Sequence, residues 1–199
     1  MRLWIGKSLQ RGMFILNRLA LINPFNRIGF IRKPLRTFRS DALTPSIRRL
    51  GPQGGNACAR IHAQSFPHPW SAEEFESLLA GRAVIAHAAT LPDSFWRPGE
   101  GPAGFVLSRQ AADQAEILTI AVAPKLRGKG IGAALLAAHL PALAASGVRS
   151  LFLEVEAGNQ AAIRLYESFG FRQVGERKAY YRSASGARAT ALVLRRDLV

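Results

Sequence analysis

The alternation of hydrophobic and polar positions after residue 45 predicts a mixture of strands and helices. Short apolar or alternating runs, which are typical of strands, cover residues 47–50, 83–90, 103–109, 116–122, 151–156, 171–176 and 189–195. Helical patterns cover residues 56–66, the segment after Ser71, residues 130–146 and residues 159–169. A series of strand pairs followed by strand–helix–strand–helix predicts a single domain of the α/β or mixed α+β class.

Local signals support several of these boundaries. Ser71 is followed three residues later by Glu74, the spacing of a capping box at a helix start. Asn159 is a natural N-cap for the helix after it, and Gly170 closes that helix. Pro141 falls inside the 130–146 pattern, where it removes one backbone hydrogen bond, so we expect a bend in that helix.

Residues 1–45 differ from the rest and predict a separate N-terminal extension ahead of a domain at 46–199. Apolar side chains alternate with Arg and Lys at roughly helical spacing up to Pro24, a basic amphipathic pattern compatible with a surface-lying helix. A flexible tail and an organellar transit peptide are the alternatives. The longest apolar stretch, residues 13–16, is too short for the core of a secretory signal.

The charge is concentrated in this extension. The chain has 27 basic and 13 acidic side chains, a net charge of +14, and residues 1–45 hold nine of the bases and one of the acids, a net +8. Such a field favours polyanions, so RNA, an anionic membrane surface or a phosphate-rich cofactor are the expected partners.

Composition excludes several classes of protein. The single cysteine, Cys58, excludes an internal disulfide framework and a multi-cysteine zinc site. The four histidines show no metal-binding spacing, so no metal is expected. No apolar run approaches the roughly 18 residues of a membrane span. We therefore expect a soluble, cytoplasmic protein that is a monomer or a weak dimer.

The segment from Ile120 to Leu136 carries the first candidate chemistry. A predicted strand enters a loop that holds Arg127 and three glycines, and a helix follows. Glycines let backbone N–H groups approach a ligand, and a helix N-terminus favours anions, so this loop is suited to a pyrophosphate. A purely structural turn is the alternative reading.

Glu154 is the second candidate, because it lies within an apolar strand. Leu151, Leu153 and Val155 share one face of this strand, and Phe152, Glu154 and Glu156 share the other. The carboxylate therefore lies against a polar partner, faces a cleft or is simply solvated.

Together the two segments resemble the GNAT family of acetyl-coenzyme A-dependent N-acetyltransferases. Arg127-Gly-Lys-Gly-Ile-Gly is similar to the family's pyrophosphate loop, and Asn159 followed by Leu-Tyr-Glu and Phe-Gly-Phe is similar to its C-terminal motif. Phe66-Pro-His-Pro-Trp-Ser and the pair Tyr180-Tyr181 resemble the ribosomal-protein-alanine N-acetyltransferase branch. Residues 1–45, the extra His68-Pro69 and the segment Arg188–Thr190 depart from the family pattern.

The resemblance implies a fold, a cofactor and a set of roles. The fold is a mixed, mostly antiparallel sheet flanked by helices, with parallel central strands splayed around acetyl-coenzyme A. Glu154 is implied as the general base and Tyr166 as the general acid. Trp70, Tyr180 and Tyr181 are implied to bind the acceptor. The residues implied to hold the coenzyme are Ile120, Ala121, Val122, Arg127, Gly128, Lys129, Gly130, Ile131, Gly132 and Asn159.

The implied reaction is acetylation of a protein N-terminus, with the N-terminal alanine of a small-subunit ribosomal protein as the expected acceptor. A small-molecule amine or a lysine side chain is the alternative acceptor. A coenzyme- or RNA-binding protein without catalysis is the alternative of a different class.

Overall fold

The computed structural model describes residues 44–92, 101–182 and 188–198. The side chains of residues 179–182, 188 and 189 are outside this description. Backbone contacts divide the chain into two units, Met1–Thr37 and Phe38–Val199, and every described residue belongs to the second. The amphipathic helix predicted near the N-terminus therefore lies outside the described residues.

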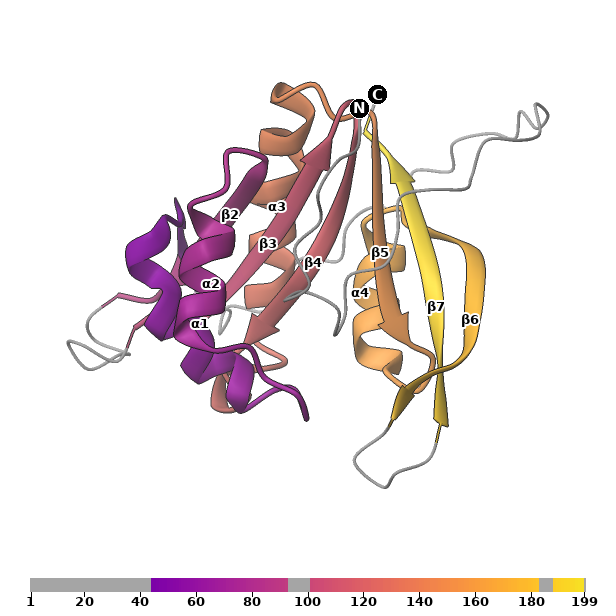
Figure 1. Ribbon diagram of the computed structural model, residues 1–199, viewed down its shortest axis with the longest axis horizontal. Coiled ribbons are helices and arrows are strands. Elements are labelled where there is room, and N and C mark those ends of the chain that lie inside the picture. Colours follow the sequence, from indigo (N-terminus) through magenta and orange to yellow (C-terminus); the bar gives the residue numbers. More distant parts are fainter. Residues whose placement is uncertain (1–43, 93–100, 183–187, 199) are drawn as a thin grey trace, which may run out of the picture. The chain divides into compact units, whose positions relative to one another are not determined.

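Seven strands form one sheet in the order β1-β2-β3-β4-β5-β7-β6 (Figure 1). Their bounds are β1 Ser46–Arg49, β2 Val84–Thr90, β3 Gly104–Ala111, β4 Gln114–Val122, β5 Ser150–Glu156, β6 Arg172–Arg182 and β7 Arg188–Asp197. Only β4 and β5 pair in parallel, and the other neighbours are antiparallel. The prediction of a mixed, mostly antiparallel sheet is confirmed.

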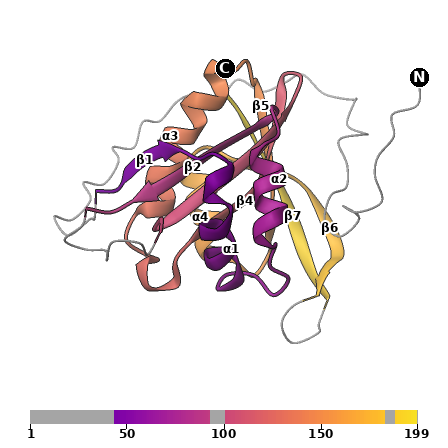
Figure 2. The ribbon, with the colours of Figure 1, turned by 60° about the vertical axis from the view of Figure 1, so that its left-hand side comes forward.

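Four helices cover the two faces of the sheet (Figure 2). Helices α1 (Gly55–Ala63) and α2 (Ala72–Leu79) lie on one face, and α3 (Ile131–Ala145) and α4 (Gln160–Ser168) lie on the other. Two short 3-10 turns, η1 (Pro52–Gly54) and η2 (Pro124–Leu126), precede α1 and α3. In the described part of the chain, no helix has the length and apolar character needed to cross a membrane.

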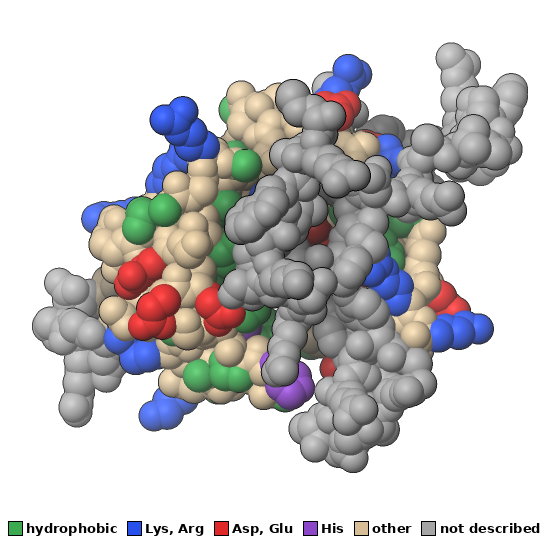
Figure 3. All heavy atoms as spheres, in the orientation of Figure 1, with side chains coloured by type: hydrophobic (Ala, Val, Ile, Leu, Met, Phe, Trp, Pro, Cys, Tyr) green, Lys and Arg blue, Asp and Glu red, His purple; other side chains and the backbone are tan. Residues whose placement is uncertain are grey.

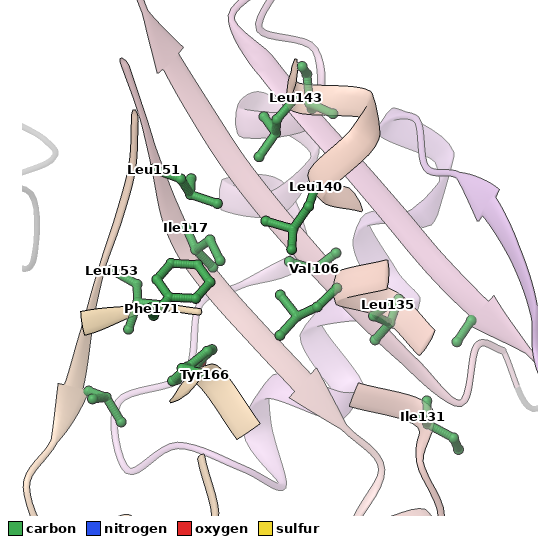
Figure 4. Packing of buried hydrophobic residues seen from close by; sticks show 14 of the residues in the cluster. Val106, Ile117, Ile131, Leu135, Leu140, Leu143, Leu151, Leu153, Tyr166 and Phe171 are labelled. Atoms are coloured by element: carbon green, nitrogen blue, oxygen red, sulfur yellow. The ribbon is translucent and has the colours of Figure 1, made fainter. Parts of the chain in front are cut away.

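Each helical layer has its own hydrophobic core. Leu135, Leu140 and Leu143 of α3 pack with Leu151 and Leu153 of β5 on the α3/α4 side (Figure 4). The smaller core on the α1/α2 side contains Cys58, Ile61, Phe75, Phe105 and Leu107. A fully buried Leu or Phe contributes about 1.5–3 kcal/mol, so the two cores hold the sheet between the helical layers.

Helix α2 begins with the predicted capping box. The Ser71 hydroxyl accepts a hydrogen bond from Glu74 N at 3.2 Å, and Ser71 N donates to Glu74 Oε2 at 2.8 Å. Glu73, Glu74 and Glu76 are exposed, and acidic side chains gather over α2 in Figure 3. Carboxylates in the first turn are stabilised by the positive end of the helix dipole.

Several predicted boundaries were wrong by a few residues. The strands predicted at 103–109 and 116–122 continue to Ala111 and begin at Gln114, and they leave a two-residue turn with Ala112 at φ +55°. Strand β6 extends to Arg182 rather than residue 176. The sequence after residue 176 has no strand-like pattern, but pairing with β7 gives its backbone N–H and C=O groups hydrogen-bond partners. Helix α3 continues through Pro141 as expected, and its bend stays a prediction.

Candidate active site

The candidate site is centred where the two parallel strands separate. β4 and β5 are paired only from Gln114 with Ser150 to Ile117 with Leu153, although β4 continues to Val122 and β5 to Glu156. Figure 1 shows the two strands diverging from this point. The separation confirms the predicted splay of the parallel strands and leaves the end of β4 without β5 as its neighbour.

The residues predicted to line a coenzyme arm lie on this diverging end of β4. Ile120, Ala121 and Val122 pair with β3 on their other side. Nearby, the hydroxyl of Thr119 is buried and has no hydrogen-bond partner among the described residues. A buried hydroxyl is costly when unpaired, so this end of β4 offers a polar group that a bound molecule can satisfy.

The predicted pyrophosphate loop runs from η2 to the first turn of α3. Gly128 and Gly130 adopt left-handed conformations, with φ of +74° and +83°, that favour glycine. A Cβ at either position would have no neighbouring atom within 4 Å, so the space above both glycines is open. Lys129 between them is exposed, and the unpaired N–H groups of the α3 N-terminus follow.

Arg127 is engaged in the structure in a way that the sequence did not indicate. Its Nε donates to the carbonyl of Val122 at 3.1 Å, and its Nη2 donates to the Ser65 hydroxyl at 2.9 Å. The side chain therefore links the end of β4 to the segment after α1, next to the open loop.

Ile131 and Gly132 contribute to packing at this loop. Ile131 is 1% exposed and belongs to the α3/α4 core, so its side chain anchors the helix start. A Cβ on Gly132 would lie 3.2 Å from Leu165 Cδ2, which shows that the glycine permits close contact between α3 and α4. Only the backbone of these two residues is available to a ligand.

Glu154 has the polar partner that its place in an apolar strand suggested. Its Oε1 lies 3.0 Å from Nε of Arg177 on β6, and its side chain is 16% exposed. Burial raises the pKa of Glu154, and the positive charge of Arg177 opposes that rise. The sequence left open whether Glu154 has a polar partner, and Arg177 is that partner.

Tyr166 is a core residue on the opposite side of the sheet. It is 5% exposed and packs edge-on against Phe171 with 5.7 Å between ring centroids. Figure 4 shows Tyr166 and Phe171 in the same core as Leu153. Because Leu153 and Val155 also face this core, Glu154 projects to the other face. Glu154 and Tyr166 thus flank β5 next to the opening between β4 and β5.

A second carboxylate, Glu116 of β4, was missed by the sequence analysis. Ala115 and Ile117 face the α3/α4 core, so Glu116 projects to the same face as Glu154. Burial and the charge of Glu154 raise the pKa of Glu116, while Arg109 and Arg177 oppose the rise. Only the pairing of β4 with β5 brings these two glutamates together.

Asn159 and Trp70 are placed by local contacts. Asn159 is the N-cap of α4 as predicted, with its Oδ1 accepting from Ala162 N at 3.1 Å. Trp70 lies between α1 and α2, where its ring stacks on His62 at 5.0 Å and its backbone N–H donates to His62 Nδ1 at 3.1 Å. Phe66 stacks on the same imidazole at 4.2 Å.

Tyr180 and Tyr181 lie near the end of β6, and their side chains are outside the described residues. Their predicted role in binding the acceptor therefore stays a prediction. Among the described residues, no group of three or more His, Cys, Asp or Glu side chains is arranged to hold a metal ion.

Sequence comparison finds relatives over most of the chain. Residues 56–171 match the acetyltransferase (GNAT) family. The chain is 34% identical over 139 residues to the [ribosomal protein bS18]-alanine N-acetyltransferase of Escherichia coli. The aligned region covers 69% of this chain and 87% of the relative. It is 35% identical over 172 residues, or 84% of its length, to an uncharacterized Mycobacterium leprae protein, and spans 45% of that relative.

Solved structures share the same fold. The crystal structure of the Escherichia coli ribosomal-protein-S18-alanine N-acetyltransferase matches with a TM-score of 0.69 and 32% identity, covering 78% of this chain and 94% of that chain. Arabidopsis thaliana NAA60 in complex with acetyl-CoA matches with a TM-score of 0.66 and 25% identity, covering 77% of this chain and 98% of that chain.

Proposed function

Because this chain belongs to the acetyltransferase (GNAT) family and is an acetyl-coenzyme A-dependent N-acetyltransferase, we propose that it acetylates the α-amine of a protein N-terminus. The proposed acceptor is the N-terminal alanine of a small-subunit ribosomal protein. The similarity over 87% of the Escherichia coli bS18-alanine enzyme supports this acceptor. Such an acceptor would make the cytoplasm the place of action.

The described residues fit the coenzyme that the family uses. Open space above Gly128 and Gly130, the exposed Lys129 and the N-terminus of α3 are suited to a pyrophosphate. The proposed contacts of the pantetheine arm are residues 120–122 and Asn159. When bound, the coenzyme supplies an acetyl group activated as a thioester.

The proposed chemistry rests on one observation, namely that Glu154 and Tyr166 flank the opening between β4 and β5 from opposite faces. Glu154 is the proposed base, which accepts a proton from the acceptor nitrogen on its carboxylate. Burial raises its pKa and so makes it a stronger base than a solvated glutamate. Arg177 keeps the carboxylate charged and oriented before the proton arrives.

Tyr166 is the proposed acid on the other side of the opening. A phenol O–H is a hydrogen-bond donor at neutral pH and can therefore protonate or stabilise a departing sulfur. Burial of the ring against Phe171 holds the hydroxyl in one position, because the ring has no room to change rotamer.

The acceptor's own proton affinity favours an α-amine. An α-amine with a pKa of about 7.7–8.0 is about one-tenth neutral at pH 7, whereas a lysine amine with a pKa of about 10.4 is far below 1% neutral. A single moderately strengthened carboxylate is therefore sufficient for an N-terminal amine.

A peptide panel tests the acceptor. Peptides that differ only in their first residue, a matched peptide with a blocked N-terminus and an internal lysine, and a free small amine are each incubated with acetyl-coenzyme A. Mass spectrometry should locate the acetyl group on the α-amine of the peptide that begins with alanine. Turnover of the small amine without acetylation of any N-terminal peptide would refute the proposed acceptor.

A pair of variants tests the proposed base. Glu154→Gln removes the carboxylate and should lower kcat about 10²-fold while leaving coenzyme affinity, measured by calorimetry, unchanged. Glu156→Gln is the matched control, because Glu156 is an exposed glutamate two residues further on the same face of β5. Equal kcat in wild type and Glu154→Gln at every pH would remove Glu154 from this role.

A further inference from the structure

A second carboxylate, that of Glu116, lies in the candidate site near the proposed base Glu154. Glu116 is directly opposite Phe152 in the parallel register of β4 and β5, so Glu154 lies two residues further along the neighbouring strand. Both carboxylates project to the face away from the α3/α4 core. Glu154 is the first residue of β5 after the last paired position, Leu153, so both carboxylates border the opening between the two strands.

Arg177 joins this pair from a strand that is not adjacent to β5. β6 is separated from β5 by β7, and Ala191 of β7 is opposite both Arg177 and Glu156. Because the side chain of Ala191 is small, the Arg177 side chain can cross β7 and reach Glu154 Oε1 at 3.0 Å. Arg177 therefore forms its ion pair with Glu154 across β7.

The charges that face Glu116 come from three strands. Arg109 of β3 is opposite it, Glu154 comes from β5, and Arg177 comes from β6. Helix α1 packs on the same face of the sheet as Glu116 and carries Arg60 and His62, whereas His139 of α3 lies on the other face. The pKa values of His62 and His139 are lowered by burial to about 4 and about 3, so both imidazoles stay neutral near pH 7.

We propose that Glu116 is a positioning residue for Glu154, whose negative charge beside the catalytic carboxylate strengthens Glu154 as a base. This inference rests on the role of Glu154 in the proposed function. When both groups are ionised, the charge of Glu116 disfavours the charge of Glu154 and so favours its protonated form. Arg177 acts in the opposite direction, because its positive charge lowers the pKa of Glu154.

The coupling is reciprocal, and this makes it measurable without substrate. The charge of Glu154 increases the proton affinity of Glu116 by some factor, and the charge of Glu116 increases the proton affinity of Glu154 by the same factor. Burial raises the pKa of both glutamates, and the two carboxylates therefore titrate as a coupled pair.

The first test is a titration of the full-length protein labelled with ¹³C at the glutamate side-chain carboxyl, followed by NMR. Loss of one resonance in Glu116→Gln and another in Glu154→Gln assigns the pair. The midpoint of Glu116 should be lower in Glu154→Gln than in the wild type and unchanged in the control Glu156→Gln. An equal midpoint of Glu116 in wild type and Glu154→Gln would overturn the proposal.

The second test is kinetic and uses a pH above both midpoints. Glu116→Gln should lower kcat severalfold with the KM for the coenzyme unchanged, because Glu154 becomes a weaker base. Glu116→Asp, which restores the charge, should recover most of that loss. An unchanged kcat in Glu116→Gln, or no recovery in Glu116→Asp, would overturn the proposal. If peptides are not acetylated, kcat is measured with whichever amine is turned over, and the titration result stands independently.

Discussion

Acidification should destabilise this protein through His139, a buried histidine on α3. Its Nδ1 lies 2.8 Å from His87 Nδ1, and its Nε2 lies 2.7 Å from the hydroxyl of Ser108. His139 and Ser108 are both 0% exposed. Burial, with a smaller contribution from the charge of His87, lowers the pKa of His139 to about 3 from the ordinary 6.5.

The sign and size follow from proton linkage. The unfolded chain binds a proton at this imidazole near pH 6.5 while the folded protein does not, so the stability that His139 contributes is complete above pH 6.5 and declines as the pH falls toward 3. Between pH 7 and pH 5 the loss from this one group is about 2 kcal/mol. His62, with its pKa lowered to about 4, loses stability in the same direction.

Urea unfolding followed by circular dichroism at pH 7 and pH 5 measures this loss. The variant is His139→Leu combined with Ser108→Ala, because Leu alone would leave the buried Ser108 hydroxyl without its partner. The difference in unfolding free energy between the two pH values should be smaller in this variant by about 2 kcal/mol. The control is His68→Gln, which removes an exposed histidine. An identical pH dependence in the double variant and the wild type would refute the reasoning.

Three further changes test the fold and the extension. Ser71→Ala removes the α2 cap and should cost about 1 kcal/mol in urea unfolding, whereas Ser77→Ala on the same helix should not. Gly104→Ala places a Cβ 2.7 Å from the carbonyl of Ala121 and should cost about 1–3 kcal/mol, whereas Gly158, with 3.7 Å to its nearest neighbour, should tolerate alanine. Deletion of residues 1–45 removes a charge of +8 and should abolish low-salt retention on RNA or anionic vesicles with peptide turnover unchanged. Loss of turnover would instead show that the extension supports the domain.

The charge pattern, the element order and the glycine-rich loop were all readable from the sequence, because each depends on local chemistry. Gly128 and Gly130 adopt positive φ, Asn159 caps α4, and Ser71 forms its capping box as predicted. The two faces of β5 also followed from simple alternation, since Leu151, Leu153 and Val155 all face one core.

The partners of the site were decided by tertiary structure alone. The register of β3 and β4 shifts between Leu107, which pairs with Thr119, and Ser108, which pairs with Ile117. This bulge leaves Leu118 of β4 as an extra residue. Ile117 therefore faces the α3/α4 core while Ala121, four residues on, faces the α1/α2 core, although a period of two would put them on one face.

Long-range pairing brings Glu116, Glu154 and Arg177 to one side of the split sheet from three separate strands. The sequence by itself indicated Glu154 and Tyr166 as candidates and the element on which each lies. It did not indicate Glu116 and Arg177, because these residues lie 38 positions before and 23 positions after Glu154. Strand order and register bring them near it, and a local sequence pattern does not encode such long-range pairing.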